Sequence, residues 1–362
     1  MDKLIAKIGK GLRGAKDLTW EEAKEAVASL IEGQATPHQV GAFLMAMRIK
    51  TETVTEMAAF TSKVRTYVPP VKIPVDRNVV DVPVYGEKHN TFHACVPSAI
   101  VAAAAGASVL LHGMDNPACA SDLPRVLNSL NIPTKLQGEA LGTTIEEQGF
   151  GFLDLAIYHP PLASFLDLRH ELGVQNFFHQ VVRLLNPSRS SSQVIGVTHP
   201  PYLEKIPEAV NMMGGHRVMV FQGVEGYPEL SISTPTLLRE LRNERFIPFN
   251  LKPQHIRLSL GSFQNMTIPV NTPANEVPTQ EAALIRKILS NEIQDSARDW
   301  VVYNAAMLLY AGSQASTISA GVPLAIQSLE SGAAAKKLAS LAVSSAADDT
   351  NDLGKKKEIV HA

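Results

Sequence analysis

The chain has 362 residues, of which 45% are hydrophobic and 19% charged, and its formal net charge is −2 at pH 7. These values predict a globular protein with a large domain and a smaller one, and argue against attraction of nucleic acid by the whole molecule. Apolar runs are shorter than about 18 residues, so a membrane span is not expected. The lysine-rich start does not resemble a secretion signal, and we expect a cytoplasmic protein.

Residues 1–68 show only helical periodicity. The basic residues of the first segment recur every three or four positions: Lys3, Lys7, Lys10, Arg13 and Lys16. If one helix continues through the glycines between them, they share one face. A solvated face is the simpler interpretation, and an anion-binding face is the alternative.

Three further helices are indicated at 18–33, 36–51 and 53–68. Thr19 and Glu22 have the spacing of a capping box, and Thr36 followed by Pro37 is a typical helix start. The prolines of "PPVKIP" then predict a linker into a second domain.

From residue 78 the pattern alternates between strands and helices. We expect strands at 78–84, 108–113, 150–157, 193–198 and 217–223, and helices at 97–107, 122–132 and 206–215. This order predicts an α/β domain with a mostly parallel sheet flanked by helices, and a ligand site at the carboxyl ends of the strands. Helices return at 279–290, 297–311 and 313–330. The polar residues 341–362 predict a disordered tail. Cys95 and Cys119 are too few and too far apart for a zinc cluster or a disulfide framework.

Several segments occur in the order and spacing of one known family: "EGQATPHQVGAFLMAMRIKTETVTEMAAF", "NTFH", "VAAAAGASVLLHG", "YHPPLASFLDLRHELGVQNFFH" and "NAAMLLYAGSQASTISAGVPLA". The chain resembles the anthranilate phosphoribosyltransferase family (glycosyltransferase family 3), which shares its fold with pyrimidine nucleoside phosphorylases. The resemblance implies a helical dimerisation domain at 1–68, with parts of 170–190, and an α/β domain at 76–340. A homodimer is therefore expected.

The motifs that hold phosphoribosyl pyrophosphate in that family are altered here. The family's Gly-Thr-Gly-Gly-Asp loop corresponds to residues 83–87, where Pro83 lacks an N–H donor and Tyr85 adds bulk. The matching phosphate-loop residues are Gly86, Asn90 and Thr91, and Ser121 remains from a serine-rich segment. The resemblance is thus to a divergent side branch without the phosphate motifs.

The family's magnesium-binding Asp-Glu pair reads Pro228-Glu229 in this chain. Glu229 alone would be a weak Mg²⁺ ligand, since this ion is usually held by one or two carboxylates together with substrate phosphates. We therefore expect no cofactor, with Mg²⁺ bound only if a transferase activity remains.

Residues on the acceptor side match the family more closely: they are His112, Gly113, Tyr158, His159 and Arg169. The resemblance implies contact of Arg169 with the anthranilate side of the pocket. Each residue also has a plain structural interpretation, because "YHPP" can shape a turn and Arg169 can pair with Glu171 or with a carbonyl group. We assign no catalytic residue.

Basic side chains replace other residues of the family pattern: Lys88, His89, Arg125 and Arg183. With Lys3, Lys7, Lys10 and Arg13 they are candidate contacts for the phosphates of single-stranded nucleic acid. The resemblance supports this interpretation, because a branch of the family without phosphate motifs is associated with nucleic-acid binding. The alternatives are a divergent phosphoribosyl- or glycosyltransferase with another substrate, and a pseudoenzyme with a protein partner.

Overall fold

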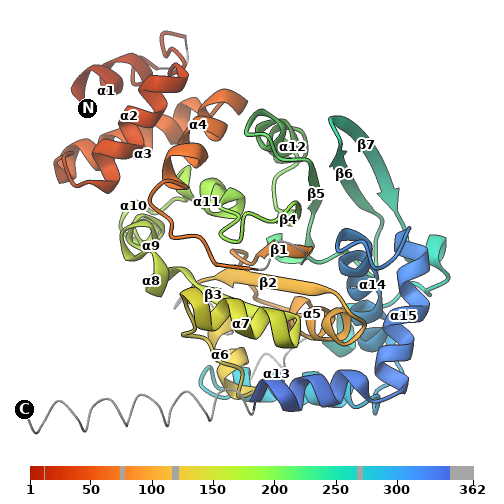
Figure 1. Cartoon of the computed structure of the whole chain (residues 1–362). Helices are drawn as coiled ribbons and strands as arrows, with labels where there is room; N and C mark the ends of the chain where they lie inside the picture. Colours follow the sequence, from red (N-terminus) through yellow and green to blue (C-terminus); the bar gives the residue numbers. More distant parts are fainter. Residues whose placement is uncertain (12, 74–77, 116–121, 267–271, 343–362) are drawn as a thin grey trace, which may run out of the picture.

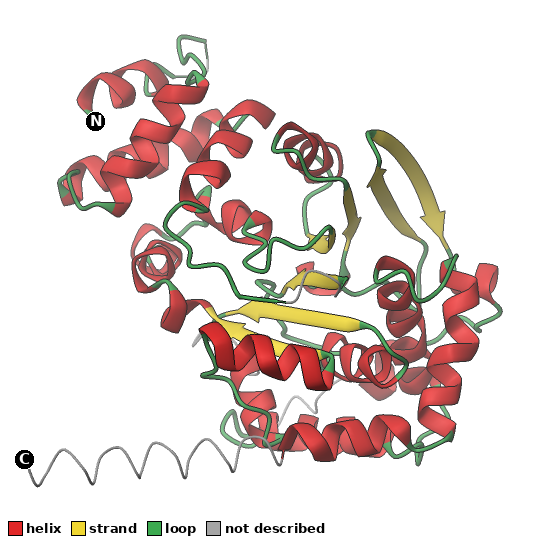
Figure 2. Cartoon of the chain, in the orientation of Figure 1, coloured by secondary structure: helices red, strands yellow, loops and turns green. Residues whose placement is uncertain are grey.

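A computed structural model of the protein describes residues 1–11, 13–73, 78–115, 122–266 and 272–342. Within these ranges a helical unit formed mainly by the N-terminal segment stands beside a larger α/β unit (Figure 1). Figure 2 shows the strands inside the larger unit, with helices around them. Ser121, Cys119 and the tail beyond 342 lie outside the described residues.

The helical unit begins with α1 (Asp2–Ile8), α2 (Trp20–Ile31), α3 (Pro37–Lys50) and α4 (Val54–Val64). The predicted capping box of α2 is confirmed, since Thr19 accepts from the N–H of Glu22 and the Glu22 side chain accepts from the N–H of Thr19. The predicted start of α3 at Thr36 is also confirmed. In contrast, α1 ends at Ile8, so the later basic residues do not continue its face.

Short helices from the middle of the chain complete the helical unit. These are α8 (Leu155–Tyr158), α9 (Pro160–Asp167), α10 (Arg169–Leu172), α11 (Phe178–Val181) and the 3-10 turn η1 (Val182–Leu184). The ring of Phe177 lies 4.4 Å from that of Phe60 in α4, between ring centroids. An apolar core therefore joins segments more than a hundred residues apart in sequence.

The described residues form a seven-stranded sheet in the order β3-β2-β1-β4-β5-β6-β7. Its strands are β1 (Val79–Pro83), β2 (Ser108–Gly113), β3 (Phe150–Asp154), β4 (Ser192–Val197), β5 (Arg217–Gln222), β6 (Thr236–Arg242) and β7 (Arg245–Leu251). Strands β1–β5 are parallel, as the sequence predicts. The antiparallel β6 and β7 were not among the expected elements, and the predicted strand at 150–157 ends early because α8 begins at Leu155.

Helices cover both faces of the sheet. On one face lie α5 (Cys95–Ala104) and α14 (Ser296–Ala311), backed by α6 (Leu123–Ser129), α13 (Val277–Leu289) and α15 (Ile318–Glu330). On the other face α7 (Gly138–Gln148) packs on β2 and β3, and α12 (Tyr202–Met212) on β5. The described residues include no helix that is long and apolar enough to cross a membrane.

The remaining short turns are η2 (Val224–Gly226), η3 (Pro253–Ile256) and η4 (Phe263–Met266). Among these, η2 follows β5 directly and faces the loop between β1 and α5. Parallel strands expose their carboxyl ends at one edge, so these two connections meet where ligands bind in such sheets.

Candidate functional site

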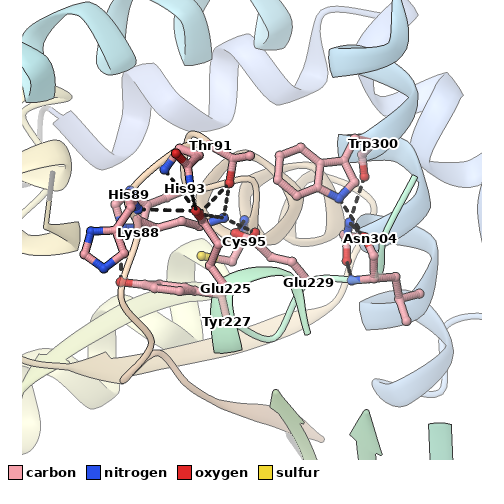
Figure 3. Close-up of polar contacts among 12 residues, drawn as sticks. Lys88, His89, Thr91, His93, Cys95, Glu225, Tyr227, Glu229, Trp300 and Asn304 are labelled. Carbon is pink, nitrogen blue, oxygen red and sulfur yellow. Dashed lines mark hydrogen bonds and ion pairs between the residues drawn. The ribbon is translucent and has the colours of Figure 1, made fainter. Parts of the chain in front are cut away.

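Lys88 is the centre of the loop between β1 and α5, and its side chain is 1% exposed. Its Nζ lies 2.5 Å from Glu229 Oε2 and 3.9 Å from Glu225 Oε2, and it donates a hydrogen bond of 2.8 Å to Thr91 Oγ1. The rings of Tyr227 and Trp300 lie about 5 Å from the same nitrogen. Figure 3 shows this cation enclosed by the protein's own carboxylates, hydroxyl and rings.

Glu229 is fully buried and uses both of its carboxylate oxygens. While Oε2 pairs with Lys88, Oε1 accepts a 2.9 Å hydrogen bond from the backbone N–H of Cys95, at the start of α5. A Mg²⁺ ion needs open oxygen ligands, and here an ammonium group stands against the carboxylate that the family resemblance assigns to metal. The described residues contain no cluster of three or more His, Cys, Asp or Glu side chains suited to a metal ion.

Glu225 holds the loop from the opposite side. Its Oε1 accepts 2.9 Å bonds from the backbone N–H and side-chain amide of Asn90, and its Oε2 accepts a 2.9 Å bond from Thr91 Oγ1. Burial opposes the charged carboxylate, but Lys88 and the hydrogen bonds from Thr91 and Asn90 outweigh it and lower the pKa of Glu225. The two phosphate-loop remnants therefore already bind an anion, which is a protein carboxylate.

Gly86 is the third remnant, and Tyr227 closes the space above it. A Cβ added at Gly86 would lie 2.2 Å from Cδ2 of the Tyr227 ring. The Tyr227 hydroxyl lies 3.1 Å from Nε2 of the buried His93, whose Nδ1 lies 2.7 Å from Glu281 Oε1. The Tyr227 ring therefore occupies the space beside Gly86 that a ligand could otherwise take.

Among the acceptor-side residues, Arg169 lines a pocket, whereas His112 is fully buried. A small cavity of about 40 Å³ is lined by Gly86, Arg169 and several acidic residues, among them Asp115 and Asp122. Arg169 forms an ion pair with Glu87, which also accepts a 3.1 Å bond from Gln175. Burial would raise the pKa of Glu87, but the hydrogen bond and charge of Arg169 lower it.

His112 is fully buried and does not line this cavity. Its Nδ1 lies 3.0 Å from the Tyr85 hydroxyl and its Nε2 lies 3.3 Å from Asp81 Oδ2, so it links β2 to β1. Gly113 lets the backbone of Val84 approach, because a Cβ there would lie 2.9 Å from the Val84 carbonyl oxygen.

Tyr158 and His159 shape the chain entering α9. His159 Nδ1 accepts a 3.0 Å bond from the N–H of Leu162, which caps the helix. Burial lowers the pKa of His159, and this favours the neutral ring that accepts the bond. The Tyr158 hydroxyl is buried without a hydrogen-bond partner among the described residues. The turn-forming interpretation of "YHPP" therefore matches the observed geometry.

The structure corrects two expected nucleic-acid contacts. Lys88 is buried in the pair described above, and Arg183 is 5% exposed. Arg183 donates to the carbonyl oxygens of His179 and Tyr85, and burial lowers its pKa to about 10. As placed, neither side chain can meet a polymer outside the protein.

The other basic candidates differ in what they contact. Arg125 pairs with Asp122 at 2.8 Å and Asp115 at 3.4 Å, and Lys7 pairs with Glu22 at 2.5 Å. His89 is largely exposed and lies 3.6 Å from Glu87. Exposed side chains without an ion pair in the described part of the chain remain near the N-terminus: Lys3, Lys10, Arg13 and Lys16.

Sequence comparison agrees with the geometry of the fold. The chain matches the glycosyl transferase family a/b domain over residues 77–335 and the helical bundle domain of the same family over residues 2–67. The chain belongs to glycosyl transferase family 3. It is 32% identical to the anthranilate phosphoribosyltransferase of Acetivibrio thermocellus over 338 residues, covering 93% of this chain and 94% of the relative. The enzyme of Methanocorpusculum labreanum is 33% identical over 341 residues, covering 93% and 97%.

Solved structures of the family show the same architecture. The anthranilate phosphoribosyltransferase of Thermus thermophilus superposes with a TM-score of 0.81 at 28% identity, covering 93% of this chain and 98% of that one. The enzyme of Saccharomyces cerevisiae in complex with PRPP and Mg has a TM-score of 0.79 at 19% identity, covering 95% and 97%. At this identity the yeast structure supports the fold alone.

The sequence did not single out Glu225, Tyr227, Trp300 or His93. Two of these residues, Glu225 and Tyr227, belong to the segment "GVEGYPEL". Its partners could not be read from the sequence, because Lys88 and Glu229 are 141 positions apart.

Proposed function

We propose that this protein is a divergent member of glycosyl transferase family 3 whose donor site is filled by its own side chains, so that it does not carry out the phosphoribosyl transfer of its relatives. The ion pair between Lys88 and Glu229 is the observation that carries this proposal. Lys88 provides a cation beside the carboxylate that would otherwise hold Mg²⁺. Glu225 provides an anion on the loop that would otherwise hold phosphate.

The energetic argument follows from burial. Lys88 and Glu229 are 1% and 0% exposed, so opening the pair would leave two uncompensated charges in the protein interior. Separating such a pair costs about 3–5 kcal/mol, which corresponds to a loss of about 10²–10⁴ in the affinity of any ligand that requires it. A magnesium diphosphate complex would also have to displace Glu225 from Asn90 and Thr91.

Calorimetric titration with phosphoribosyl pyrophosphate and Mg²⁺ tests this proposal. We expect no saturable heat at micromolar ligand, while the Acetivibrio thermocellus enzyme gives such heat under the same conditions. Micromolar binding by this protein would refute the closed donor site. It would support the alternative, a transferase with another acceptor in the acidic cavity beside Arg169.

We also propose that the exposed basic residues near the N-terminus bind single-stranded nucleic acid. Lys3, Lys10, Arg13 and Lys16 are exposed and form no ion pair with the described carboxylates. Such side chains can neutralise phosphates and release counterions without reading bases. A homodimer through the helical unit, which the family resemblance implies, would bring two of these segments into one particle.

A gel-shift titration with a single-stranded oligonucleotide measures this activity. We expect retention at about 50 mM salt and a steep loss as salt rises, because each phosphate contact releases a counterion. Replacement of Lys3, Lys10 and Arg13 by Glu should abolish retention, whereas Lys24→Glu, on the exposed face of α2, should change it little. Failure of the native protein to bind at low salt would contradict the proposal.

A further inference from the structure

A second cavity lies at the opposite edge of the sheet, at the amino ends of β4 and β5. It has a volume of about 250 Å³, and its wall includes Arg65, Arg189, Ser190, His216 and Arg217. Ser192 and Arg217 begin their strands as register partners, so the cavity is separated by the length of the sheet from the site of Lys88. Its lining contains no Asp or Glu.

The three arginines of this cavity are not equivalent. Arg217 is neutralised, because its Nε lies 3.2 Å from Glu240 Oε1 and its guanidinium stacks over Tyr310. Arg65 and Arg189 form no ion pair with any carboxylate of the described chain. The cavity therefore presents two guanidinium groups that no carboxylate contacts directly: Asp81 acts on Arg65 only from beyond ion-pair distance, and Arg189 is exposed.

The hydrogen bonds of these two side chains hold them in place and leave donors unused. Arg65 donates through Nε and Nη2 to the carbonyl oxygens of Leu184 and Leu185, and Arg189 Nη2 donates to the carbonyl oxygen of Arg65 at 2.8 Å. Arg65 Nη1 and both Nε and Nη1 of Arg189 have no acceptor among the described residues. These are the N–H groups with which arginine forms paired bonds to phosphate oxygens.

The turn that carries Arg189 has an unusual backbone conformation and is braced by side-chain hydrogen bonds. Asn186 and Arg189 both have positive φ, at 47° and 55°, which is uncommon for residues other than glycine. The Asn186 side chain accepts a 2.9 Å bond from the N–H of Ser190 and donates a 2.8 Å bond to its carbonyl oxygen. Strain of this kind is often retained where a side chain must be held for binding.

The charges of Arg65 and Arg189 favour the binding of an anion in this cavity. Burial lowers the pKa of Arg65 to about 10, repulsion from Arg189 acts in the same direction, and the charge of Asp81 opposes both. Both groups remain charged at neutral pH, so an anion between them would relieve the repulsion. A phosphate monoester carries about −1.5 to −2 charges at this pH and offers several acceptor oxygens.

We propose that this cavity binds the phosphate group of a small phosphorylated molecule through Arg65 and Arg189. The volume suits a phosphate with a small attached group, since a water molecule in the liquid takes about 30 Å³. The site is independent of the donor site and of the N-terminal basic segment, because it shares no residue with either. A small ligand is favoured over a polymer because the contacts converge within one cavity.

Calorimetric titration with inorganic phosphate, at ionic strength held constant with chloride, tests the site. We expect saturable binding by the native protein and a loss of affinity of about tenfold or more in Arg189→Glu, in line with the loss of charge-assisted hydrogen bonds. Arg65→Gln should show a similar loss. Lys287→Glu is the matched control, because Lys287 is exposed on α13, a helix that contributes no residue to this cavity.

Three outcomes would overturn the proposal. The first is no saturable heat in the native protein, and the second is equal phosphate affinity in the native protein and a folded Arg189→Glu variant. The third is a variant that binds single-stranded oligonucleotide less well while its phosphate affinity is unchanged, which would assign Arg189 to a polymer surface. Ribose 5-phosphate should bind at least as tightly as inorganic phosphate if the ligand is a small ester.

Discussion

Replacement of Lys88 by Met tests the central contact of the donor site. Methionine retains most of the apolar stem, but it removes the ammonium group from the buried Glu229. The carboxylate would then keep one hydrogen bond, from the N–H of Cys95. Because an unpaired buried charge costs about 3–5 kcal/mol, we expect the free energy of unfolding to fall by this amount. The loss of the contacts with the Tyr227 and Trp300 rings acts in the same direction.

Urea denaturation followed by tryptophan fluorescence measures this change. The double variant Lys88→Met, Glu229→Gln should recover much of the loss, because a neutral amide can retain the Cys95 bond without an uncompensated charge. Lys24→Met is the matched control, since Lys24 pairs with Glu21 at the exposed surface and such pairs contribute about 0.2–1 kcal/mol. A loss below about 1 kcal/mol for Lys88→Met would refute the reasoning, since it would place the pair in the class of surface ion pairs.

The same variant makes a second measurement possible. With Lys88 replaced, Glu225 and Glu229 face each other without an intervening cation, and a divalent ion becomes a suitable partner. At about 100 times its Kd, Mn²⁺ should restore ~2.7 kcal/mol to Lys88→Met and leave the native protein unchanged. Equal stabilisation of both proteins would show that Mn²⁺ binds elsewhere.

Three further changes probe neighbouring features. Glu225→Gln should flatten the acid side of the plot of unfolding free energy against pH. The Glu225 carboxylate has a lowered pKa, so it stabilises the fold above its usual pKa of 4.5, and this contribution is lost as the pH falls. An unchanged slope below pH 4.5 would contradict the assignment. Gly86→Ala should destabilise the protein by about 1–3 kcal/mol because the added Cβ meets the Tyr227 ring, and Gly86→Ala with Tyr227→Leu should recover part of the loss in thermal unfolding. Thr19→Ala should cost ~1 kcal/mol through loss of the α2 cap, while Thr19→Ser should cost little.

Local features of the fold could be predicted from the sequence. The caps at Thr19 and Thr36 depend on residues three positions apart, and the alternation of strands and helices follows from hydrophobic periodicity. The β6–β7 hairpin was missed because β7 is largely exposed and places Pro248 and Asn250, which are uncommon in strands, between its apolar residues. The basic face at the N-terminus was expected only if one helix continued through the glycines, and this condition is not met because α1 ends at Ile8 with Gly9 as its C-cap.

The donor site could be predicted only in part. The proposed loss of the phosphate motifs rests on Pro83 and Tyr85, which the sequence shows, but a charged residue in a loop is normally exposed, and Lys88 was therefore assigned to the surface. Its burial depends on Glu225 and Glu229, which come from the turn after β5. Such a long-range pairing has no signature in local sequence.

If the donor site is closed as we propose, the mutual dependence of its residues limits how this protein could regain the loop of its relatives. Restoring small residues would leave the Tyr227 ring over Gly86, removing Lys88 would leave Glu229 unpaired, and removing Glu225 would free the donors of Asn90. Each single step is therefore expected to lower stability before any ligand can compensate. Because of the internal ion pair, a return to the phosphate-binding loop would require several coordinated substitutions. Further divergence of the loop would not.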